Sequence, residues 1–146
     1  MNSRLTLLFL CGEVQLYAGF ISEFQSANIQ MLIARNLAHA KSVLLNRPVD
    51  AIVLRHDGNQ DDRPLAAHMK QITPCVPVFL LTEEAQPPFA DIDSVWRAET
   101  GDPVISRAMA IFFRHLLTGS KAARPGDRLF GEADISFNRL GPRSVS

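Results

Sequence analysis

The sequence predicts an α/β protein whose five-stranded parallel sheet is covered by helices on both faces. Two observations favour this class. Short, continuous apolar runs recur along the first 118 residues, and such runs are typical of strands buried on both faces. Segments with apolar residues at helical spacing separate the runs, and regular strand–helix alternation indicates a parallel sheet. The 47% hydrophobic and 21% charged contents are those of an ordinary globular chain.

The first half of the chain holds two strand–helix pairs. The first is predicted at Leu5–Leu10 and Glu13–Ser26, because an apolar run is followed by apolar residues that recur every three or four positions. The second is predicted at Ile29–Ala34 and Leu37–Leu45, where an Ala/Leu-rich segment ends before Pro48. Each strand therefore leads into a helix that can return the chain for a parallel neighbour.

The next two strands follow the same pattern less completely. Ala51–Leu54 leads into a polar loop and a helix that opens at Pro64, and Val76–Leu81 is the fourth apolar run. Pro87 and Pro88 follow this fourth run. Because proline interrupts helical hydrogen bonding, we expect at most a turn or two of helix there.

A weaker strand, Ser94–Ala98, precedes the last predicted helix, which runs from Asp102 or Pro103 through Leu117 with Asp102 as its N-cap. The residues expected to face the sheet are Ile105, Ala108, Met109, Phe112 and Leu116. The apolar residues outside this stripe are Ile111, Phe113 and Leu117. This surplus predicts a partner surface, with cover by the carboxyl-terminal tail as the alternative.

The chain is divided into a domain at 1–118 and a tail at 119–146. The tail begins with the linker-like run TGSKAARPGDR and is too short to be a domain. Its apolar residues are Leu129, Phe130, Ile135, Phe137 and Leu140. They predict a hairpin or a docking arm, and the start of a truncated output domain is the other interpretation.

Charge and targeting signals narrow the function classes. Fifteen basic residues balance fifteen acidic ones, so the chain as a whole has no field to draw it to nucleic acid or to an anionic membrane. The apolar run at Leu5–Leu10 is short for a signal peptide. Cys11 follows the first predicted strand and Cys75 precedes the fourth, so the two lie at opposite edges of a parallel sheet. This predicts free thiols in a reducing compartment. We therefore expect a cytoplasmic protein without membrane contact.

Motifs for metals and cofactors are missing from the sequence. The histidines, at 39, 56, 68 and 115, stand singly and lack the spacing of metal ligands. Gly12 is the only glycine of the first strand–helix turn, so neither a dinucleotide fingerprint nor a P-loop is present. We expect no metal and no cofactor.

Two segments carry a resemblance to a known family. PVDAIVLR has a Pro-x-Asp opening, four apolar residues and then Arg55, and VPVFLLTEE ends an apolar strand at Thr82. Over roughly Arg4–Leu117 the chain resembles the receiver domains of two-component response regulators. The resemblance implies a doubly wound, flavodoxin-like fold with three layers and strand order 2-1-3-4-5.

The resemblance also assigns positions, and most of them have lost the residues that the family's chemistry uses. The positions of the magnesium-binding acids, the phospho-acceptor, the switch hydroxyl and the conserved lysine hold Cys11, Gly12, Arg55, Thr82 and Ala98. Of these only Thr82 matches, and Glu13 is the one acid near the first pair. Magnesium-assisted phosphoryl transfer needs clustered carboxylates and a nucleophile, which a guanidinium cannot supply. The interpretation is a pseudo-receiver that is not an enzyme.

Alternatives remain open at the same edge of the sheet. Asp57 lies two residues after Arg55 on the same side of the strand, so a register slip would make it the acceptor of a true receiver. Cys11 with His56 and Asp57 would be a nucleophile pair, although no enzyme signature surrounds them. A third hypothesis is an anion or small-molecule site that uses Arg55 and Thr82.

Arg55 itself is expected to bind a carboxylate. Glu13, Asp57 and Glu83 are the acids that this topology brings near the end of the third strand. The expected partner of the whole protein is another protein, with a homodimer through the last helix as one form. Nucleic acid is expected only if a missing output domain supplies it.

Overall fold

The computed structural model describes residues 5–12, 17–55, 63–83, 90–98, 101–120, 134–138 and 141–145. In chain order the elements are β1 (Leu5–Leu10), α1 (Ala18–Ser26), β2 (Ile29–Ala34), α2 (Leu37–Asn46), β3 (Ala51–Arg55), α3 (Arg63–Ile72), β4 (Val78–Thr82), β5 (Ser94–Arg97), α4 (Pro103–Ser120), β6 (Asp134–Asn138) and β7 (Gly141–Val145). Within these residues no helix is both long and apolar enough to cross a membrane.

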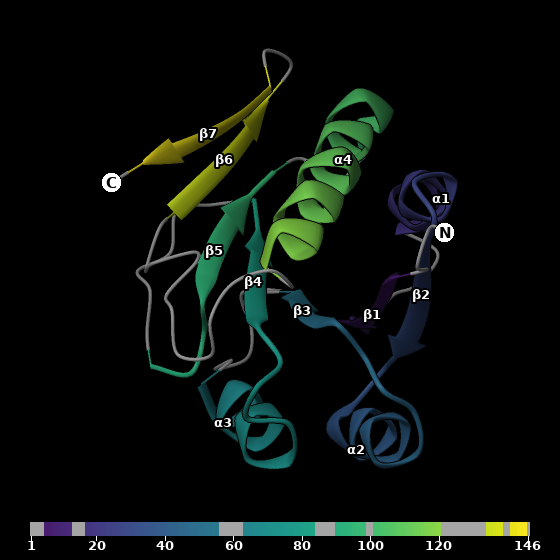
Figure 1. The fold of residues 1–146 in the computed structure, drawn as a ribbon, viewed down its shortest axis with the longest axis vertical. Coiled ribbons are helices and arrows are strands. Elements are labelled where there is room, and N and C mark those ends of the chain that lie inside the picture. Colours follow the sequence, from purple (N-terminus) through teal and green to yellow (C-terminus); the bar gives the residue numbers. More distant parts are fainter. Residues whose placement is uncertain are drawn as a thin grey trace.

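The strands form one seven-stranded sheet in the order β2-β1-β3-β4-β5-β6-β7. The first five are parallel and follow the predicted order 2-1-3-4-5, so the expected three-layer architecture is confirmed. Helices α1 and α4 cover one face of the sheet, and α2 and α3 cover the other (Figure 1). Each crossover helix therefore leads to a parallel neighbour, as right-handed β–α–β units require.

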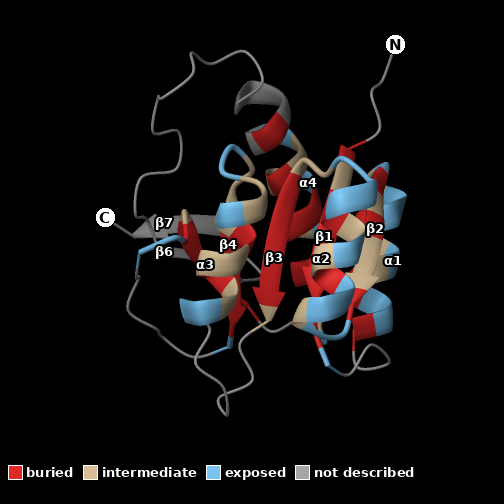
Figure 2. Cartoon of the chain, turned by 90° about the horizontal axis from the view of Figure 1, so that it is seen from below, coloured by how far each residue is buried: buried red, intermediate tan, exposed pale blue. Residues whose placement is uncertain are grey.

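Continuous apolar runs form strands with a core on each face, because successive side chains point to opposite sides of a sheet. In β1, Leu7 and Phe9 belong to the core under α1 and α4, and Leu8 and Leu10 to the core above α2 and α3. Strand β3 is an inner strand, between β1 and β4, and is buried along its length except at its last residue (Figure 2).

Aromatic rings fill the core beneath α1 and α4. Phe79 of β4 stacks on Trp96 of β5 with 4.6 Å between the ring centroids, and Phe113 of α4 meets Trp96 edge-on at 5.4 Å. Phe24 of α1 lies 5.9 Å from Phe113, so the two helices share this cluster. Rings in tilted and edge-on contact add to the stability that their burial provides.

The buried face of α4 contains Ile105 and Met109, as predicted, but differs from the predicted face toward the carboxyl end of the helix. Ile105, Met109, Phe113 and Leu117 form the buried stripe, while Phe112 is only partly buried. Phe113 and Leu117 therefore belong to the core and not to a surplus, and the side chain of Leu116 lies outside the described residues. Both candidate stripes have helical spacing, and the small residues Ala110 and Ser106 allow the observed face to pack against the sheet. Ile111 is 48% exposed.

Helix ends are set by caps that the sequence shows only in part. The backbone N–H of Val104 donates to Asp102 Oδ1 at 2.9 Å, which confirms Asp102 as the N-cap of α4. Asn36 caps α2 in the same way, accepting from the His39 N–H at 2.8 Å. Helix α1 begins at Ala18, five residues later than predicted, and the residues 13–16 that were included in it lie outside the described part.

The carboxyl-terminal tail forms a hairpin, one of the two forms expected for it. Strand β6 pairs in parallel with β5, and β7 pairs antiparallel with β6. The hairpin extends the sheet beyond β5 and lies beside α4 (Figure 1). Within the tail, strands β6 and β7 therefore belong to the sheet of the preceding domain, while residues 119 and 120 are the end of α4.

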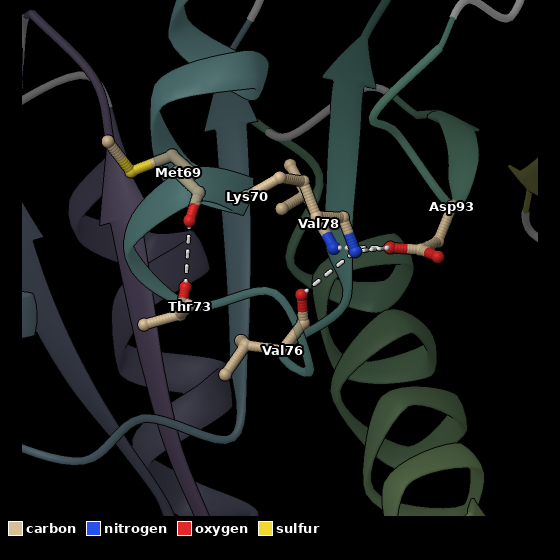
Figure 3. A network of polar contacts seen from close by, with 6 residues as sticks. All are labelled: Met69, Lys70, Thr73, Val76, Val78 and Asp93. Carbon is tan, nitrogen blue, oxygen red and sulfur yellow. Dashed lines mark hydrogen bonds and ion pairs between the residues drawn. The ribbon is translucent and has the colours of Figure 1, made fainter. Parts of the chain in front are cut away.

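Two aspartates fasten neighbouring strands at the amino-terminal edge of the sheet. The N–H of Asp50 donates to the Thr6 carbonyl at 2.7 Å, and its Oδ2 accepts from the Thr6 N–H at 2.8 Å. Asp93 makes the same pair of bonds to Val78, each 2.7 Å long. Lys70 Nζ adds an ion pair to Asp93 Oδ2 at 3.0 Å (Figure 3). The Pro-x-Asp opening thus satisfies backbone groups where the ladder between strands begins.

Candidate functional site

The predicted site residues that the structure describes lie at the carboxyl edge of the sheet. Arg55 and Thr82 end β3 and β4, Cys11 and Gly12 follow β1, and Ala98 follows β5. Because the strands are parallel, their ends meet along one edge, where open α/β sheets bind ligands. The other predicted residues, Glu13, His56 and Asp57, lie outside the described part of the chain.

The Arg55 side chain is bound by protein oxygen atoms and is 14% exposed. Its Nε donates to the Tyr17 hydroxyl at 2.5 Å, and its Nη1 donates to the Leu81 carbonyl at 3.3 Å. Its Nη2 lies 4.0 Å from Glu83 Oε1, the limit of an ion pair, and the Glu83 side chain is 53% exposed. Glu83 is one of the three carboxylates expected near Arg55. The short contact to Tyr17 was not predicted from the sequence.

Tyr17 connects Arg55 to the aromatic core. Its ring meets Phe9 edge-on, with 5.4 Å between centroids, and the guanidinium carbon of Arg55 lies 5.6 Å from the centroid of the Tyr17 ring. The sequence pattern identified Tyr17 only as an apolar position of a helix. Its signal for a polar role is chemical, because a buried tyrosine needs a partner for its hydroxyl.

The Cys11 thiol is held in its neutral form. Cys11 is buried, and its backbone N–H donates to the Ala34 carbonyl at 3.0 Å. Burial raises the pKa of the thiol to about 11, although the positive charges of Arg35 and Arg55 oppose the rise. Since the thiolate is the nucleophilic form, this environment does not favour the Cys11 nucleophile that the sequence left open.

The raised pKa predicts slow alkylation of Cys11. At pH 8, a shift from 9.0 to about 11 lowers the thiolate fraction about 100-fold. Iodoacetamide should therefore modify the exposed Cys75 rapidly and leave Cys11 unmodified, as mass spectrometry of digested protein would show. Cys75 serves as the control within the same molecule. Equal labelling of both cysteines in the folded protein would contradict the prediction.

The ends of β4 and β5 place a basic residue beside Thr82. Thr82 is buried, its carbonyl accepts the Ala98 N–H at 3.0 Å, and the strand register sets Arg97 opposite it. The sequence comparison placed Ala98 at the family's lysine position. In the register, Arg97 is the residue level with Thr82, so β5 ends in a cation one position before Ala98.

The described residues at this edge do not fit magnesium. Receiver chemistry uses carboxylate oxygens for this hard cation, but β1 and β3 end here in a thiol, a glycine and a guanidinium. Among the residues that the structure describes, no three acidic, histidine or cysteine side chains gather closely enough to hold a metal ion.

Solved structures share this fold. The signal receiver domain of an HD domain-containing protein from Pseudomonas fluorescens Pf-5 superposes with a TM-score of 0.66 at 17% identity, over 83% of this chain and all of that chain. A CheY-like response regulator receiver domain protein from Methanospirillum hungatei JF-1 gives 0.64 at 11% identity, over 82% and 98%. A sensor protein from Polaromonas sp. JS666 gives 0.63 at 12% identity, over 80% and 98%.

These likenesses define the class of fold. The chain has the CheY-like, flavodoxin-like fold of receiver domains, as the sequence resemblance implied. The sequence matches no protein-family model and no curated protein.

Proposed function

We propose that this chain is a receiver-like signalling domain that acts through contact with a protein partner, without phosphorylation at the end of β3. The observation that carries the proposal is Arg55, which stands where the family resemblance places the acceptor aspartate and binds Tyr17 and the Leu81 carbonyl. A guanidinium stays protonated and only donates hydrogen bonds, so it cannot attack a phosphoryl group. The receiver fold supports the signalling part of the proposal.

The proposal includes a cytoplasmic setting and no enzymatic activity or cofactor. Cys11 and Cys75 are free thiols, which suits a reducing compartment. The balanced charge of the whole chain gives no general attraction to nucleic acid, so such contact would need a further domain. A second copy of the chain is the partner that we expect first, in the region of α4.

The proposal predicts no response to a phosphoryl mimic. Magnesium with beryllofluoride should leave the melting temperature unchanged, because β1 and β3 do not end in the carboxylates that both groups need. Binding to the native state at 100 times the dissociation constant would instead stabilise the protein by about 2.7 kcal/mol. Thermal melts followed by circular dichroism would measure this, with an intact receiver domain as positive control. A saturable rise in melting temperature would contradict the proposal.

Two competing functions, phosphorylation of Asp57 and anion binding, each predict a different experimental result. If Asp57 is the acceptor, acetyl phosphate and magnesium will produce a shifted band on a phosphate-affinity gel, and the Asp57→Ala variant will lack it. If the edge binds free anions, isothermal titration with inorganic phosphate will give saturable heat that Arg55→Gln abolishes. Either result would replace the proposed function.

A further inference from the structure

The sheet ends on the side opposite the tail hairpin in a strand whose outer edge is open. Strand β2 is the terminal strand there and pairs with β1 over all six of its residues (Figure 1). Among the residues that the structure describes, no strand pairs with β2 on its other side. An open edge presents unpaired backbone N–H and C=O groups, through which a sheet accepts a strand from another chain.

One hydrogen bond shows which backbone groups of β2 point outward. The Cys11 N–H donates to the Ala34 carbonyl at 3.0 Å, so the backbone groups of Ala34 point toward β1. This direction alternates along a strand, so every second residue before Ala34 also faces β1. The residues between them, Ile29, Met31 and Ile33, therefore direct their N–H and C=O groups away from the sheet and offer them to an added strand.

Strand β2 lacks the features that usually block an edge strand. Its sequence, IQMLIA, has no charged residue and no proline, whereas β7 at the opposite edge contains Pro142 and Arg143. Proline removes a backbone donor, and charge disfavours pairing between edges. Leu32 and Ile33 are partly buried and pack against opposite cores, so each face of the edge also has an apolar side chain within reach of a partner. Of the two edges, β2 is therefore the one suited to strand addition.

The surface around β2 is basic, although the chain as a whole is neutral. Residues 24–49 include no acidic side chain, and their basic side chains are Arg35, Lys41 and Arg47. Arg35 directly follows β2 and is exposed, and Arg47 is exposed at the end of α2. In the part of the chain that the structure describes, none of these three forms an ion pair. This surface complements a strand that carries carboxylates at its ends.

We propose that the β2 edge binds an extended, acidic segment of a partner protein as an added strand. Backbone hydrogen bonds with Met31 and Ile33 supply affinity, and Arg35 at the carboxyl end of β2 selects for carboxylates that flank the strand. The inference rests on the proposed function, because it names the chemistry of a protein partner and the surface that the partner contacts.

Other occupants fit this edge less well. Two copies of the chain that paired through β2 would place their α2 helices side by side, and like charges oppose each other there because α2 has no acidic residue. A nucleic acid or an anionic membrane would match the basic side chains but would leave the outward backbone groups of β2 without strand partners. An acidic strand satisfies both the backbone and the charge.

Fluorescence polarisation with the full-length protein tests the proposal. The probe is the labelled peptide EEVTVTVEE, a run of residues that favour strands between acidic ends, and KKVTVTVKK is the matched control of opposite charge. We expect saturable binding of the acidic peptide alone, with affinity that falls as salt is added. Absence of saturation by the acidic peptide up to about 1 mM, or equal binding of both peptides, would overturn the proposal.

Variants of the protein separate backbone pairing from side-chain contact. Ile33→Pro removes an outward N–H and leaves the ladder to β1, so the dissociation constant should rise about tenfold. Ile33→Ala also shortens the side chain but keeps the donor, and it should have a smaller effect. Arg35→Glu should weaken binding about threefold, as expected for an exposed charge. Equal affinities of Ile33→Pro and Ile33→Ala for the peptide would contradict strand addition.

Two further measurements make the result independent of whether Ile33→Pro folds. Backbone N-methyl groups on two successive central residues of the peptide block an inward donor in either register, so they should abolish binding to the unchanged protein. Hydrogen exchange followed by NMR should show protection of Met31 and Ile33 when peptide is added. Protection of other strands or helices without these amides would overturn the proposal.

The remaining arms of the test distinguish the alternatives. Single-stranded DNA or vesicles containing phosphatidylserine that bind more tightly than the peptide, without protecting Met31 and Ile33, would assign the basic surface to them and overturn the proposal. No phosphoryl donor or magnesium is used. Failure of strand binding is therefore distinguishable from failure of the proposed function, which the beryllofluoride melt and the phosphate-affinity gel measure.

Discussion

Truncation of Phe113 to alanine is expected to lower the free energy of unfolding by about 3–5 kcal/mol, the usual cost of removing a fully buried ring. The side chain has no exposed surface and contacts the rings of Phe24, Phe79 and Trp96. Phe112, one position earlier, is only partly buried, so Phe112→Ala should cost less than half as much. Urea titrations followed by tryptophan fluorescence would measure both variants.

Ile111→Ala is the matched control on the same helix. Its side chain is 48% exposed, and substitutions at such positions usually change stability by less than about 0.5 kcal/mol. If Phe112→Ala proved more costly than Phe113→Ala, α4 would present to the sheet the face that the sequence pattern predicted. The burial of Phe113 and Leu117 against the sheet would then be wrong.

The strands could be predicted from sequence because burial on both faces leaves a signal in every residue. The runs at β1 and β2 match the observed bounds, and β3 differs by the one residue Arg55. Helix faces carry a weaker signal. In α4 two stripes with the same spacing were available, and the choice between them depends on how the helix crosses the sheet. Local pattern alone does not contain that information.

The sequence predicted where the candidate site lies but not which contacts its residues make. Parallel topology brings Arg55, Thr82 and Cys11 to one edge, and the sequence was sufficient for that. It was not sufficient for the Tyr17–Arg55 bond, because this contact joins residues 38 positions apart through the packing of α1. The joining of β6 to β5 likewise depends on a long-range pairing, so the sequence indicated a hairpin but not where it docks.

Arg55→Asp, which restores the acceptor type of the family, is expected to destabilise the protein by about 1–3 kcal/mol. The change removes the donor to the Tyr17 hydroxyl and the donor to the Leu81 carbonyl, both partly buried. It also places a carboxylate near Glu83, where like charges oppose each other. Denaturant titration of the wild type and the variant would measure the loss.

Tyr17→Phe separates the hydrogen bond from the charge. It removes the hydroxyl that accepts from Arg55 Nε but keeps the ring that packs on Phe9, so a loss of about 1 kcal/mol is expected. Arg55→Asp should cost more than this, since it also ends the pairing with Glu83.

Restoring the aspartate should not restore the chemistry. Phosphoryl transfer also needs oxygen ligands for magnesium, and the residues after β1 remain Cys11 and Gly12 in the variant. Acetyl phosphate and magnesium should therefore leave Arg55→Asp unmodified on a phosphate-affinity gel. If the variant were more stable than the wild type, the guanidinium would be a strained replacement and not a structural one. If it became phosphorylated, the edge of the sheet would still assemble an acidic metal site, and the proposal of a phosphorylation-independent domain would have to be withdrawn.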